Sequence, residues 1–127
     1  MEIDQLHLLD IDHAIEVIGD ESILYDMLGQ FIEMNKPALE SLKKAMETHD
    51  VKTLRENAHS LKGATSYICA NKVSAIAKYM QDSCDHNNPE EAVKQYPCLI
   101  FELVNTNREI RKSLEKKKGI VVIRSKC

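Results

Sequence analysis

The sequence has little of what sheets and loops require. Its 127 residues include only four glycines and three prolines, and the β-branched and aromatic residues rarely alternate with polar ones. Frequent turn residues and period-two alternation are typical of β-sheets, so their scarcity indicates an all-α protein. A chain of this length is expected to form one domain with one buried core.

Other absences argue against several classes of function. No apolar run approaches the length that spans a bilayer, and a net charge of −3 gives no general attraction to nucleic acid, so neither a membrane nor a nucleic acid is expected as a partner. The four cysteines form no C-x-x-C pair, and the N-terminus lacks the pattern of a secretion signal. These features predict free thiols in a reducing compartment, hence a cytoplasmic location, or a nuclear one in a eukaryotic cell.

Hydrophobic residues recur every three or four positions, which is the spacing of amphipathic helices. A short segment at 11–18 stops at Gly19, and Asp20 then caps a long segment that extends to Met46. Because Pro37 lies inside it, this long segment is either one kinked helix or two helices that meet near Lys36.

Three further helices are expected. The first begins after the cap Asp50 and reaches about Cys69, and the second opens at Asn71. The H-N-N-P sequence at 86–89 is a loop, and the last helix ends at K-K-K-G, residues 116–119. Short loops between long helices favour antiparallel neighbours.

The expected fold is therefore an all-α, antiparallel up-down four-helix bundle with an additional short N-terminal helix. We place this domain at residues 8–118, with flanking tails at 1–7 and 119–127. Residues 120–127 look strand-like but have no partner strand, so we expect them to be loosely ordered.

The stretch A-H-S-L-K-G-A-T, residues 58–65, contains His59, the candidate reactive residue. By helical geometry, His59 lies roughly 130° from the centre of the apolar face of its helix, so it faces solvent. Arg55 and Lys62 are its cationic neighbours. Gly63, one turn on, costs about 1 kcal/mol relative to alanine inside a helix and leaves room for the backbone of another protein. The plain alternative is a surface histidine on a solvated basic face.

Gln81, on the following helix, is the expected partner of the His59 ring. If the two helices pack antiparallel through a tight turn near 70–71, both residues lie almost equally far from that turn. A glutamine oxygen that accepts from Nδ1–H fixes the tautomer and leaves the Nε2 lone pair outward. Lys62 can reach an anionic group placed on the ring. An exposed, oriented imidazole beside a cation is suited to carrying a phosphoryl group.

The segment at 58–64 resembles the H-x-L-K-G signature of histidine-containing phosphotransfer (HPt) domains, the intermediates of multistep two-component phosphorelays. The resemblance extends over about residues 8–116 and includes Phe31 and the Gly19-Asp20-Glu21 sequence. It implies a monomeric four-helix bundle that accepts a phosphoryl group from a receiver-domain aspartate and passes it to another receiver domain. It also implies a phosphocarrier with no ATP-dependent kinase activity, no metal and no cofactor of its own, the Mg²⁺ being bound by the partner receiver.

The resemblance also assigns roles to residues. His59 is the phosphorylated residue, Lys62 the phosphate partner, Gly63 the clearance position and Gln81 the residue that bonds the ring, with Arg55 as a further cation. The implied partners are response-regulator receiver domains and, upstream, a hybrid sensor histidine kinase. Two departures stand out: Cys69 replaces the glycine of many members, and Gln81 replaces the glutamate usual in members fused to chemotaxis kinases.

Competing interpretations remain open. The other histidines lack metal-ligand spacing, and Asp82 and Asp85 are most simply a solvated helix end. An inert scaffold or a heterodimerising bundle is the serious alternative to a phosphocarrier. A partner is expected to dock on the apolar residues of the first two helices, although all four of them can equally be core: Ile11, Ile15, Ile18 and Leu24.

Overall fold

The computed structural model describes the backbone of residues 5–126 and the side chains of residues 5–117, and this part of the chain contains six helices and no strand. In chain order the helices are α1 (Ile11–Ile18), α2 (Glu21–Glu47), α3 (Val51–Tyr67), α4 (Asn71–Asp85), α5 (Pro89–Lys94) and α6 (Tyr96–Lys126). The prediction of an all-α fold is confirmed.

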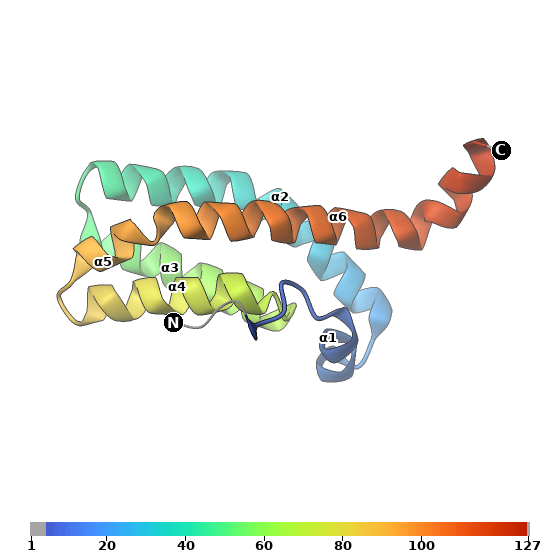
Figure 1. Cartoon of the computed structure of the whole chain (residues 1–127), viewed down its shortest axis with the longest axis horizontal. Helices are drawn as coiled ribbons and strands as arrows, with labels where there is room; N and C mark the ends of the chain where they lie inside the picture. The colour runs from blue at the N-terminus through green and yellow to red at the C-terminus, as the bar shows by residue number, and fades with distance from the viewer. Residues whose placement is uncertain (1–4, 127) are drawn as a thin grey trace.

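Four of these helices, α2, α3, α4 and α6, form an antiparallel bundle (Figure 1). Around the bundle α2 packs against α3, α3 against α4, α4 against α6, and α6 against α2. The short helix α1 lies beside the beginning of α2, at one end of the bundle (Figure 1). The expected four-helix bundle with a short N-terminal helix is therefore present.

The helix starts follow the capping residues in the sequence. Gly19 ends α1 with a φ of 83°, and the Asp20 side chain then accepts hydrogen bonds from two backbone N–H groups in the first turn of α2. Asp50 caps α3 by accepting from both the backbone N–H and the hydroxyl of Thr53. These two hydrogen bonds lower the pKa of the Asp50 carboxyl, because they favour its charged form.

The structure settles the alternatives left open by Pro37. α2 is one helix of 27 residues with Pro37 inside it, and it changes direction along its length (Figure 1). Proline has no N–H to donate, and its ring clashes with the carbonyl one turn earlier, so a bend is the expected consequence.

The structure differs from the sequence-based expectations at two places in the second half of the chain. The H-N-N-P loop leads directly into an unexpected helix, α5, because proline is favoured at the first helical position, where Pro89 lies. The last helix does not end at residues 116–119, and the tail that was expected to be loosely ordered is helical: α6 continues to Lys126. Without a partner strand, a helix is the structure in which the tail backbone pairs its own N–H and C=O groups. Cys127 lies outside the described residues.

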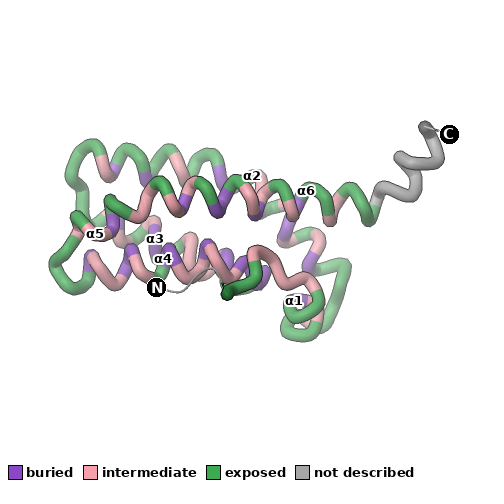
Figure 2. The backbone as a smooth tube through the Cα atoms, in the orientation of Figure 1, coloured by how far each residue is buried: buried purple, intermediate pink, exposed green. Residues whose placement is uncertain are grey.

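Buried residues recur along the four helices of the bundle (Figure 2), and they form one hydrophobic core cluster. Those with less than 2% exposure include Leu24, Leu28, Ile68, Ile76, Met80, Leu99, Leu103 and Ile110. Leu24 was expected to dock a partner, and its complete burial makes that expectation wrong, because it belongs to the core stripe of α2. Three other residues with the same expected role are partly buried and pack against this core: Ile11, Ile15 and Ile18.

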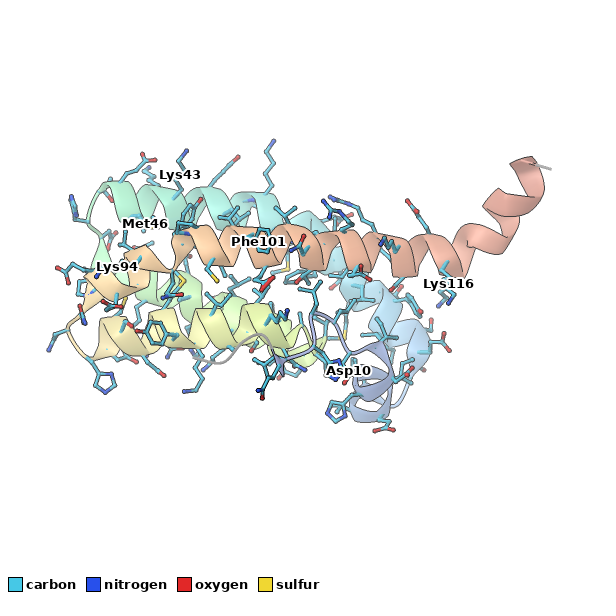
Figure 3. The ribbon with its side chains drawn as sticks, viewed as in Figure 1. Asp10, Lys43, Met46, Lys94, Phe101 and Lys116 are labelled. Carbon is cyan, nitrogen blue, oxygen red and sulfur yellow. The ribbon has the colours of Figure 1, made fainter. Side chains whose placement is uncertain are left out.

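The turn between α3 and α4 is held by the segment that precedes α1. The N–H of Asp10 donates to the carbonyl of Cys69 at 3.0 Å, and the N–H of Lys72 donates to the carbonyl of His7 at 3.2 Å. Figure 3 shows Asp10 beside α1. Cys69 has a φ of 57°, the left-handed conformation that favours glycine, and this is why α3 ends at Tyr67, two residues earlier than expected.

Alanine substitutions at the neighbouring residues Leu24 and Ile23 test which side of α2 faces the hydrophobic core. Leu24→Ala should lower the free energy of unfolding by about 2–5 kcal/mol, because it removes fully buried methyl groups and leaves a cavity. Ile23 is 50% exposed, so Ile23→Ala should change this free energy by less than about 1 kcal/mol. Urea denaturation of both variants measures the difference, and equal effects would contradict the assignment.

Candidate functional site

His59 lies on α3 and is exposed to solvent. Its neighbour Ala58 is buried, together with Leu54 and Thr65, on the opposite side of the same helix. The expectation that His59 faces solvent is therefore confirmed. A core role for this histidine is excluded by its exposure.

Three side-chain contacts join α3 to α4, and we call this series the α3–α4 ladder. It consists of Ser66 Oγ with Ser74 Oγ at 2.8 Å, His59 Nδ1 with Gln81 Oε1 at 3.1 Å, and Arg55 Nε with Asp85 Oδ1 at 2.5 Å. The residue numbers of each pair add up to the same value. This is expected when two antiparallel helices pack in one register, because each step backward along α3 is matched by an equal step forward along α4. The expected juxtaposition of His59 and Gln81 is thus observed.

The hydrogen bond between His59 and Gln81 selects one tautomer of the ring. An amide oxygen accepts and does not donate, so the Nδ1 atom that faces Gln81 Oε1 carries the proton. In the neutral ring, Nε2 then keeps its lone pair. Gln81 is 8% exposed, so its side chain is held by packing while the ring it bonds stays accessible.

A charged pair, Arg55 and Asp85, lies one helical turn from the His59–Gln81 pair. Asp85 accepts a hydrogen bond from Arg55 Nε, and this bond lowers the pKa of the Asp85 carboxyl more than any other cause. Gln81, one helical turn before Asp85 on α4, lowers the same pKa by a smaller amount. Asp85 in turn raises the pKa of the Arg55 guanidinium. Arg55, expected to be a further cation for the phosphoryl group, is therefore bound to Asp85. Asp85 is more than a solvated helix end, which the sequence did not indicate.

Two lysines lie one helical turn from the His59–Gln81 pair, one on each helix. Lys62, one turn from His59 on α3, is half-buried and has no salt bridge among the side chains of residues 5–117. Lys78, on α4, lies opposite Lys62 in the register set by the ladder, and its ammonium group pairs with Asp82 at 2.9 Å. The sequence had predicted Lys62 here but not Lys78, whose position depends on how the two helices align.

Gly63 leaves open space next to the ring. A Cβ atom placed on Gly63 meets nothing within 4 Å, so no packing against the described residues requires glycine here. His59, Gly63 and Tyr67 follow one another at four-residue spacing and therefore lie along one side of α3. The absence of a side chain at Gly63 leaves this side flat between the histidine and Tyr67.

A groove between α2 and α3 continues this flat surface. It has a volume of about 150 Å³ and is lined by Met27, Gln30, Phe31, Met34, Ala64, Tyr67 and Ile68. Met34 is 56% exposed and Tyr67 66% exposed. Sequence reasoning missed these two residues because each lies beside the core stripe of its helix and looks like an isolated apolar residue. We call this feature the α2–α3 groove.

Among the residues that the structure describes, no three histidine, cysteine, aspartate or glutamate side chains form a group that could hold a metal ion. Within the same residues, no helix is both long and apolar enough to cross a membrane.

Comparison with known proteins gives two matches. The model of the Hpt domain family matches residues 26–115, which is more than half of the chain and includes all of α3 and α4. Among curated proteins, the phosphorelay intermediate protein rdeA of Dictyostelium discoideum is 24% identical over 104 residues. That alignment covers 80% of this chain and 41% of rdeA, so the chain spans about two fifths of its relative's length. No solved structure matches the chain significantly.

Proposed function

The chain belongs to the Hpt domain family, and from this premise we propose that it carries a phosphoryl group on His59 between two receiver domains. A response-regulator receiver phosphorylated on aspartate is the donor, and a second receiver is the acceptor. A hybrid sensor histidine kinase supplies the relay upstream. The observation that supports this proposal most is the hydrogen bond between His59 Nδ1 and Gln81, which leaves Nε2 free on an exposed ring.

The proposed transfer is an in-line displacement at phosphorus. The Nε2 lone pair forms the N–P bond while the P–O bond to the receiver aspartate breaks, and the aspartate leaves as a carboxylate with the electron pair. The ring becomes a phosphorylated imidazolium that keeps its Nδ1–H. Gln81 Oε1 continues to accept from this N–H and so stabilises the positive charge that forms. Transfer to the second receiver is the reverse reaction.

Each side supplies different parts of the reaction. This chain contributes the nucleophile, its orientation and the cations Lys62 and Lys78, and it acts as a monomeric phosphocarrier rather than as an ATP-dependent kinase. Mg²⁺ bound by the receiver stabilises charge on the phosphoryl oxygens. Docking of the two proteins places the phosphorus in line with Nε2. The entropic cost of bringing the two reacting atoms together is then met by the binding of the two proteins and does not add to the barrier of the chemical step.

We further propose that the receiver docks across Gly63 and on the α2–α3 groove. The groove exposes Met34 and Tyr67 beside the glycine, so an apolar partner surface can bury them while its acidic site reaches His59. This location replaces the docking role first given to Leu24, which is buried.

The direct test of phosphoacceptance uses His59→Gln. Incubated with a phosphorylated receiver domain, the wild type should acquire acid-labile, base-stable phosphate, and His59→Gln should acquire none. The variant should keep its helical circular-dichroism signal, because exposed substitutions change stability by less than about 0.5 kcal/mol. His7→Gln, at a side chain 72% exposed, is the matched control and should accept phosphate normally. Phosphate that persists on His59→Gln would contradict the proposal and favour an inert scaffold.

A comparison of substitutions at Gly63 and Gly29 distinguishes two effects of glycine: the space it leaves for a docking partner and its low helix propensity. Both glycines lie in helices, and neither has atoms within 4 Å of an added Cβ, so Gly63→Gln and Gly29→Gln should each stabilise the fold by about 0.5–1 kcal/mol. Gly63→Gln alone should slow transfer by about tenfold or more, which corresponds to a steric penalty of at least about 1.4 kcal/mol in the docked complex. Equal transfer rates for the two variants in a rapid-quench assay would show that Gly63 does not provide clearance.

Lys62→Ala should reduce both the extent of phosphorylation and the half-life of the phosphohistidine without preventing docking. A phosphoryl group adds nearly two negative charges beside His59, and Lys62 is a nearby cation without an acidic partner among the described side chains. Lys78 should compensate in part, so the effect is a reduction rather than a loss. Lys52→Ala, at an exposed position two turns away on α3, is the control. A half-life equal to that of the wild type at low salt would refute the role of Lys62.

A further inference from the structure

Arg55 and Asp85 form a charged pair that the proposed chemistry does not use. Arg55 lies on α3, one turn before His59, and Asp85 is the last residue of α4, one turn after Gln81. Their side chains are 42% and 38% exposed, and exposed pairs of this kind stabilise folded proteins little. Stability is therefore a weak explanation for the pair.

The pair is connected to the ring through Gln81. Asp85 accepts from Arg55 Nε at 2.5 Å, and Gln81 Oε1 contacts His59 Nδ1 at 3.1 Å. Gln81 and Asp85 are four residues apart on α4, the spacing at which a glutamine amide and an aspartate carboxylate of one helix can hydrogen-bond. Gln81 also lowers the pKa of the Asp85 carboxyl, as expected of a donor beside it. A carboxylate only accepts, so the end of the amide that faces Asp85 is its NH₂ group. The opposite end, facing the ring, is then the oxygen.

We propose that Asp85, held in place by Arg55, is a positioning residue for His59: it orients the Gln81 amide so that the ring keeps its proton on Nδ1. The inference about the tautomer stands on the Arg55–Asp85 and His59–Gln81 hydrogen bonds and on the four-residue spacing of Gln81 and Asp85, whereas its consequence for phosphoryl transfer rests on the proposed function. Arg55 thus acts through Asp85 and not as a ligand of the phosphoryl group.

Removal of the Asp85 carboxylate should allow the side-chain amide of Gln81 to rotate. Without a carboxylate beside its NH₂ group, Gln81 can rotate so that this group faces the ring and donates to it. A ring nitrogen that accepts such a bond has no proton, so the proton moves to Nε2 and the lone pair needed for attack is lost. The phosphoacceptor is then present and exposed but in its unreactive tautomer.

The tautomer is measured on the full chain with ¹⁵N-labelled histidine, by long-range ¹H–¹⁵N correlation spectra at about pH 8, where ordinary imidazoles are neutral. The wild type should show His59 mainly as the Nδ1–H form. Asp85→Ala should lower the ratio of the Nδ1–H to the Nε2–H form by about threefold or more, the scale of one lost hydrogen bond. Arg55→Ala should shift it in the same direction by less, because the carboxylate remains.

Asp82→Ala is the matched control, since it removes the same charge from the same helix at a residue that pairs with Lys78. It should leave the His59 tautomer ratio unchanged, while circular dichroism verifies that all variants stay folded. An unchanged ratio in folded Asp85→Ala, or an equal shift in Asp82→Ala, overturns the inference. Phosphorylation assays separate the two claims: a wild type that accepts no phosphate refutes the proposed function and leaves the tautomer result standing.

Discussion

The register in which α4 packs against α3 decides which side chain meets His59. The tight turn after Tyr67, with Cys69 in the left-handed conformation and its carbonyl bonded to the N–H of Asp10, starts α4 at Asn71. From that start, Gln81 arrives beside the ring. A shift of one residue along α4 would rotate each side chain by about 100° and remove Gln81 from Nδ1. The site therefore depends on a turn more than two helical turns away.

Two local features of the chain carry a conformational cost. Gly63 weakens a helix at a position where a side chain would meet nothing, and Cys69 adopts a φ that favours glycine. Such departures from local preference are expected at functional sites, while the surrounding core compensates for them. Gly63 keeps the surface beside His59 flat, and Cys69 allows the tight turn after which α4 runs antiparallel to α3.

Much of the site could be predicted from the sequence because it depends on helical periodicity. Periodicity placed His59 on the solvent side, and equal distances from the turn brought Gln81 to it. The contacts that were not predicted depend on relations between helices. The Arg55–Asp85 pair and the position of Lys78 opposite Lys62 require the exact register. The burial of Leu24 and the exposure of its neighbour Ile23 depend on which side of α2 faces the other helices. The helical course of residues 120–126 was missed because β-propensity has no effect without a partner strand.

The central claim is that His59 reacts through Nε2 while Gln81 holds the proton on Nδ1. It is tested most directly by ¹⁵N and ³¹P NMR of the ¹⁵N-histidine-labelled chain after reaction with a phosphorylated receiver domain. The account predicts coupling of one phosphorus nucleus to Nε2 of His59, with Nδ1 still protonated. Phosphorus on Nδ1, on another histidine or on no residue of the chain would contradict it.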